Sequence, residues 1–234
     1  MLALSPIKTA GPACADGYRP ICEPLWATAA VFGSPDVETV RLVLSGARRL
    51  DAAHVQFERI RQQLDRPLPP LGSPLGRAAM HAVIGDAELA IIALDMALTI
   101  AVGLNGRFRV PVPVPPLTRE KQPFVAELRD HYSHVDERAL GLIMGKPNAR
   151  AKLAFEFDPL IDAREFSDGE RALGVDAEAT DLMVATRDYF VRVWLELVGE
   201  AVKRGNAAAG VNWAAANLTG DDRAASLRVS DTDE

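Results

Sequence analysis

Clusters of proline and glycine divide this chain into four long segments with helical periodicity, and this division limits the folds available to it. Gly33-Ser34-Pro35-Asp36 and Gly72-Ser73-Pro74 each place a capping serine directly before a proline, a pattern typical of a helix N-terminus. Apolar residues recur every three or four positions in the segments that predict helices: 34–64, 74–103, 118–144 and 176–205. Four long helices with connections of modest length predict an all-α fold, a four-helix bundle.

The remaining segments have a different character. Residues 1–33 lack a sustained period and predict an irregular N-terminal arm, which docks on the core through Tyr18, Ile21, Leu25 and Trp26. Four prolines within 107–116 predict a stiff, extended, proline-rich crossover. Residues 151–157 alternate weakly and suggest a short hairpin. We therefore expect an arm over 1–33, a helical bundle domain over 34–205 and a flexible, disordered acidic tail over 206–234.

Composition and charge exclude several classes of protein. The 234 residues are 48% hydrophobic and 25% charged, the ordinary balance of a soluble globular chain. Two cysteines, Cys14 and Cys22, are too few for a disulfide scaffold. A net charge of −6 argues against a general nucleic-acid coat protein, although it leaves room for a local basic site.

The chain shows no sign of export or membrane insertion at the level of sequence. Its first residues lack the continuous apolar run of a signal peptide. The longest apolar stretch, 89–104, is interrupted by Asp95 and is shorter than a bilayer span. These features predict a cytoplasmic protein with no membrane association.

The densest polar constellation lies within the predicted third helix, over residues 127–138. His131 and His134, two of the four histidines in the chain, fall within four residues of each other. Histidine titrates near neutrality and can move a proton, while the planar guanidinium of Arg129 suits phosphate oxygens. An arginine and a histidine are the groups that metal-free phosphodiester cleavage requires.

The run Arg129-Asp130-His131-Tyr132-Ser133-His134 resembles the motif of the HEPN superfamily, an arginine, a polar residue, three variable positions and a histidine. The resemblance implies a bundle of four or more helices with the motif on one long helix. Many members are metal-independent ribonucleases of toxin–antitoxin, abortive-infection and CRISPR systems. They act as homodimers, in which the motif helices of two protomers form one composite cleft.

Residue roles follow from this resemblance. It implies that Arg129 binds the scissile phosphate, that His134 acts in general acid/base catalysis and that Asp130 orients its neighbours. The supporting residues are His131, Tyr132, Asp136 and Asp95. The resemblance also implies an RNA substrate, an antitoxin-like protein partner and no cofactor.

Helix geometry leaves a second hypothesis open. Residues five apart on a helix point about 140° away from each other, so Arg129 and His134 meet only across a dimer or through a local distortion. Carboxylates at Asp130, Asp136 and Glu137 surround His134 and repel an RNA backbone. The alternative is a non-catalytic helical-bundle interaction protein whose polar cluster on the third helix forms a dimer or partner interface.

Four further features of the sequence have structural interpretations. Asp95 lies in an apolar run and needs a buried partner, for which Arg129, Arg187 and Arg192 are candidates. His54 falls on an apolar seam and is interpreted as a core histidine. No Glu-x-x-His occurs, so no metal site is predicted, although His54, His81, His131 and His134 leave a three-histidine site conceivable. The predicted core stripe of the third helix comprises Phe124, Val125, Leu128, Tyr132, Val135, Ala139, Leu142 and Ile143.

Overall fold

The structure is a computed structural model that describes residues 17–32, 37–70, 72–108, 110–133, 142–143, 146–147, 159–167 and 170–203. These residues are mostly helical, as the predicted all-α class requires. The long helices are α1 (Cys22–Phe32), α2 (Val37–Leu64), α3 (Pro74–Phe108), α4 (Pro116–Ser133) and α6 (Ala177–Lys203).

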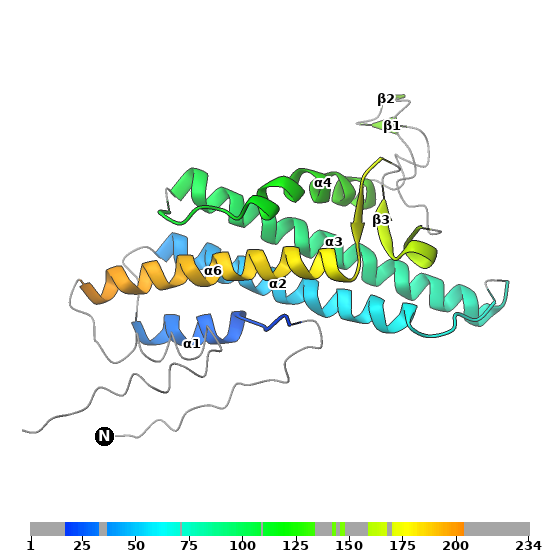
Figure 1. The fold of residues 1–234 in the computed structure, drawn as a ribbon, viewed down its shortest axis with the longest axis horizontal. Coiled ribbons are helices and arrows are strands. Elements are labelled where there is room, and N and C mark those ends of the chain that lie inside the picture. Colours follow the sequence, from blue (N-terminus) through cyan, green and yellow to red (C-terminus); the bar gives the residue numbers. More distant parts are fainter. Residues whose placement is uncertain are drawn as a thin grey trace, which may run out of the picture.

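The helices pack side by side with α3 at the centre (Figure 1). The most extensive pairing joins α2 to α3, and α4 packs on α3 next to it. Figure 1 shows α6 lying across α2 and α3, with α1 along one edge of α6 and α4 along the other. The buried face of α3 is rich in small residues, including Ala87, Ala90, Ala97 and Ala101. Small side chains let neighbouring helices approach closely.

Several predicted helix boundaries are confirmed. Ser73 Oγ accepts a 3.0 Å hydrogen bond from the backbone N–H of Gly76, so Ser73 caps α3 and Pro74 is its first residue. Both α2 and α6 lie within the ranges predicted for them. The other predicted start, Gly33 to Asp36, lies outside the described residues.

The prediction of an irregular N-terminal arm is wrong for Cys22–Phe32, which forms α1. Tyr18, Ile21 and Leu25 are buried as expected, but Trp26 is 63% exposed and does not dock. The N-terminus of α1 is fixed by Asp51 on α2, a residue distant in sequence. Local patterns therefore do not reveal this helix.

The predicted end of the central helix is also wrong, because α3 continues past Gly103 and Gly106 to Phe108. Leu104 is buried, and Asn105 Nδ2 donates to the carbonyl oxygens of Val110 and Val112. These contacts hold the last turn. The crossover that follows has no regular secondary structure over 110–115 and bends at 111–112, with Val110, Val112 and Val114 buried between exposed prolines.

The third predicted helix begins earlier and ends earlier than expected. It begins at Pro116, and Leu142–Ile143 forms strand β1, paired antiparallel with β2 (Lys146–Pro147), instead of continuing the helix. A second hairpin joins β3 (Glu165–Ser167) to β4 (Ala172–Gly174), after the π-helical turn η1 (Pro159–Ala163). The suggested hairpin at 151–157 and the acidic tail lie outside the described residues.

The apolar character of α3 bears on the membrane prediction. Pro74–Gly106 is long and apolar enough to cross a membrane by length and composition, with a mean hydropathy of 2.0 in its most apolar window. The apolar helix is thus longer than the apolar stretch 89–104 that is apparent in the sequence. Core helices of soluble proteins have the same composition, and more than half of this window is buried in the bundle.

Candidate functional site

Asp95 is a buried carboxylate at the contact between α3 and α4. Only 5% of its surface is exposed, and its neighbours on α3 are apolar. The hydroxyl of Thr99, one turn further on, lies 3.4 Å from Asp95 Oδ1. Burial raises the pKa of Asp95, and the charge of Arg129 with the hydrogen bond from Thr99 offsets part of that rise.

Arg129 on α4 is the ion-pair partner of Asp95, one of the three candidates that the sequence suggested. Arg129 Nε lies 3.2 Å from Asp95 Oδ2, and Nη1 lies 3.1 Å from Asp130 Oδ1. The Nε–H is not directed at the Asp95 oxygen closely enough for a hydrogen bond, so their attraction is Coulombic. One guanidinium is therefore shared between a buried and a half-exposed carboxylate.

The other predicted site residues lie on or beyond the last turn of α4. His131 is half-buried on α4. Tyr132 belongs to the same helix, but its side chain lies outside the described part, as do His134 and Asp136. The structure thus brings together Arg129, Asp130 and Asp95, and the pairing of Arg129 with His134 stays a prediction.

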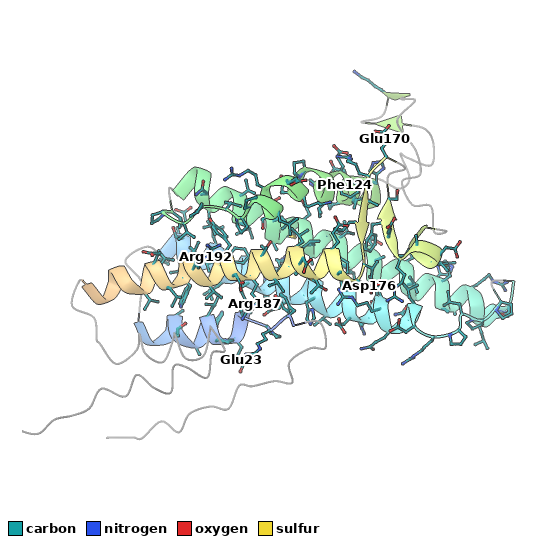
Figure 2. The ribbon with its side chains drawn as sticks, viewed as in Figure 1. Glu23, Phe124, Glu170, Asp176, Arg187 and Arg192 are labelled. Atoms are coloured by element: carbon teal, nitrogen blue, oxygen red, sulfur yellow. The ribbon has the colours of Figure 1, made fainter. Side chains whose placement is uncertain are left out.

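Arg187 and Arg192, the other candidate partners of Asp95, have different roles on α6 (Figure 2). Arg187 Nε donates to the backbone carbonyl of Arg19, and Nη1 contacts Asp188. Arg192 Nε donates to the Asp188 carbonyl at 3.3 Å. Arg187 and Arg192 line an open groove of about 530 Å³, together with Pro115 and the apolar side chains of α6. No pattern in the sequence predicts this groove.

A second polar cluster, also missed, joins α1 to α2 through Asp51. Tyr18 Oη donates to Asp51 Oδ1 at 2.7 Å, and the backbone N–H groups of Ile21 and Cys22 donate to the same carboxylate. The Tyr18 ring stacks on His54 at 4.4 Å, and His54 is buried as predicted. Burial raises the pKa of Asp51, and these hydrogen bonds oppose the rise. The feature of the sequence that pointed to this cluster was an acidic residue next to the apolar face of α2.

Arg61 on α2 and Arg171 in the β3–β4 hairpin make a third set of contacts. The buried guanidinium of Arg61 donates to the carbonyls of Val175 and Asp176 and to Thr180 Oγ1, which fixes the start of α6. Arg171, in the turn of the β3–β4 hairpin, lies over the ring of Phe124 on α4, 4.7 Å from its centroid; Figure 2 labels Phe124. These contacts position elements and contain no nucleophile with an adjacent base.

Within the described residues, no group of three histidine, cysteine or acidic side chains is arranged to hold a metal ion.

The chain matches no family model, and no curated protein or solved structure shows significant similarity to it. The contacts of Arg129 with Asp95 and Asp130 are therefore the strongest evidence on the predicted site. A phosphate that approached Arg129 would meet a cluster with one cation and two carboxylates.

Proposed function

We propose that this protein is a non-catalytic helical-bundle interaction protein, and that the polar cluster on α4 forms part of a dimer or partner interface. One observation carries the proposal: Arg129 is already paired with Asp95 and Asp130. A guanidinium that serves as a phosphate clamp needs uncompensated positive charge, whereas this one sits in a cluster of net negative charge.

The cluster suits an interface because it combines a fixed core with an accessible edge. Asp95 is buried and anchors Arg129, while Asp130 and Glu127 keep about half of their side-chain surface exposed. Exposed charges of this kind set the register and specificity of an interface more than its affinity. The proposal places the protein in the cytoplasm, as the sequence predicts.

The test compares association with RNA cleavage. We expect the wild-type protein to leave a fluorescent single-stranded RNA intact in the presence of EDTA, while Asp130→Lys weakens association in a sedimentation experiment. Asp181→Lys is the control, since it changes the same charge at an exposed position on α6. Unchanged association of Asp130→Lys would contradict the role of the cluster.

The second candidate is a HEPN-like, metal-independent endoribonuclease or toxin/defence effector with a composite dimer site. The motif supports it, and so does the fact that 39% of the Arg129 side chain remains exposed on a long helix of a bundle. In this candidate Arg129 exchanges its carboxylate partners for a phosphate, and an antitoxin-like protein restrains the activity. Cleavage of RNA that is lost in both Arg129→Ala and His134→Ala would favour this candidate over the first.

A further inference from the structure

A face of α3 that points away from the bundle core carries a continuous line of apolar and small residues. The residues occur at alternating spacings of three and four, the spacing of coiled-coil contact positions. None of them is buried. We call this line the α3 seam, and it consists of Leu75, Ala78, Ala82, Gly85, Leu89, Ile92, Met96, Thr99, Gly103 and Gly106.

The seam is unusually apolar for a surface. It contains no charged side chain over its whole length, and Leu75, Leu89 and Met96 are 73%, 53% and 37% exposed. Contiguous apolar surface of this kind marks a contact site on a folded protein. Its heptad spacing indicates that the contact is another helix.

Three glycines of the seam have no packing role within the protomer. A Cβ atom at Gly85, Gly103 or Gly106 would meet no atom within 4 Å. By contrast, a Cβ at Gly46 would collide with Phe190, and one at Gly76 with the backbone of Pro70. Glycine inside a helix costs about 1 kcal/mol relative to alanine, and three such glycines in one exposed apolar line leave room for a second helix to approach closely.

Charged groups border the seam on both sides. On the α2 side, Asp86 pairs with Arg59 and accepts from Gln63. On the α4 side, Asp95 pairs with Arg129, and Gln122 donates to Thr99. Figure 1 shows α3 running between these two helices. The apolar strip is thus about one helix wide, with polar edges that would lose hydration if the face entered a bilayer.

We propose that a second copy of this chain packs its own α3 seam antiparallel on this one. An antiparallel pairing sets Met96 against Gly85 of the second copy and Leu75 against Gly106, each a large residue against a glycine, while Leu89 and Ile92 of the two copies pack on each other at the centre. A parallel pairing sets each glycine against itself and leaves voids, which close-packed interfaces avoid. The isologous two-fold arrangement is the commonest symmetry of soluble oligomers.

The size of the seam is sufficient for a specific contact. From Leu75 to Gly106 the helix rises about 47 Å, and a strip about 10 Å wide along it covers roughly 500 Å² per copy. Two copies then bury about 1,000 Å², the lower end of the range for specific interfaces. The inference goes beyond the proposed function because the seam does not include the polar cluster on α4, so either can fail without the other.

The test is the oligomeric state of the full chain, measured by sedimentation equilibrium over a concentration series. We expect a dimer for the wild type and at least a tenfold weaker association for Gly85→Leu, whose new side chain meets open space in the protomer. Circular dichroism and the melting temperature of Gly85→Leu should show an intact fold. Adding Met96→Ala to Gly85→Leu exchanges large for small across the seam and should restore the dimer.

Two controls isolate the seam. Gly199→Leu places the same side chain where a Cβ also meets no atom within 4 Å, but on α6. Trp26→Glu changes an exposed side chain on α1, whereas Leu89→Glu places the same charge at the centre of the seam. Both controls should remain dimeric and Leu89→Glu should not. Three results would overturn the proposal: a monomeric wild type, a dimer that is insensitive to Leu89→Glu, or a monomer that binds phosphatidylcholine vesicles. Failure of the Met96→Ala rescue would overturn the antiparallel register.

Discussion

Replacing Arg129 by alanine tests whether this residue holds a buried charge or serves a substrate. The substitution leaves the Asp95 carboxylate buried without its cation, with the hydroxyl of Thr99 and the negative charge of Asp130 nearby. A buried carboxylate without a counter-ion destabilises the folded state because its hydration is not replaced. We therefore expect Arg129→Ala to lower the free energy of unfolding.

The separation of the two charges sets the magnitude. At the 3.2 Å between Arg129 Nε and Asp95 Oδ2, Coulomb's law gives about 5 kcal/mol for an effective dielectric constant of about 20, and about 1.3 kcal/mol for that of water. Because 39% of the Arg129 side chain is exposed, solvent screens the pair. We expect a loss of about 2 kcal/mol at neutral pH, between these limits.

The assay is urea unfolding of Arg129→Ala, Asp95→Asn and the double variant. Asp95→Asn removes the buried charge, so the double variant should be more stable than Arg129→Ala alone. Arg59→Ala serves as a control, since Arg59 pairs with Asp86 at 3.4 Å but is 58% exposed. That exposed pair should be worth at most about 1 kcal/mol.

The pH dependence has a definite sign. Burial raises the pKa of Asp95, and removing Arg129 raises it further. A carboxyl with a raised pKa in the folded state stabilises the protein fully below its unfolded pKa, near 3.8, and that contribution is lost as the pH rises through the folded pKa. The destabilisation by Arg129→Ala should therefore shrink as the pH falls toward about 4. An equal loss at every pH, or a double variant less stable than Arg129→Ala, would refute a charge-anchoring role.

Three other predictions follow from single contacts. Asp51→Ala removes the acceptor for Tyr18 and for the N-terminus of α1, so urea unfolding should show a loss of about 2–3 kcal/mol. Gly46→Ala forces a Cβ onto Phe190 and should cost about 1–3 kcal/mol, whereas Gly199→Ala, with open space at its Cβ, should be neutral or stabilising in the same assay. Burial raises the pKa of the Cys22 thiol, so peptide-resolved mass spectrometry should show slower alkylation at pH 8 in native protein than in urea.

The parts of the fold that sequence predicts are those fixed by neighbouring residues. Ser73 and Pro74 begin α3 because the capping oxygen and the N–H that donates to it lie within three residues of each other. The partner of Asp95 was predictable in kind, because a buried acid within an apolar helix requires a cation. The choice of Arg129 over Arg187 and Arg192 needed the structure, since only the packing of α4 on α3 decides which cation reaches it.

The parts that sequence missed depend on distant residues. The helix α1 begins where Asp51, some thirty residues away, accepts from its first N–H groups. The glycines at 103 and 106 predicted a helix end, but burial of Leu104 and the hydrogen bonds of Asn105 carry α3 past them. In each case tertiary contacts outweigh a local preference of about 1 kcal/mol.

The α3 seam and the Asp95–Arg129 pair lie on one helix, and this links the two proposals. Asp95 directly precedes Met96, so the ion pair borders the seam on its α4 side. In the antiparallel pairing, the two-fold axis puts the α4 edges of both α3 helices on the same side of the dimer. The two copies of Asp95 are then about 14 Å apart along the helices. Both α4 helices then lie on that side, as a composite ribonuclease cleft requires. Any RNA cleavage by the dimer should therefore disappear in Gly85→Leu. Cleavage by the monomeric Gly85→Leu variant would refute a composite cleft, but it would not affect the proposal that the α3 seam forms a dimer.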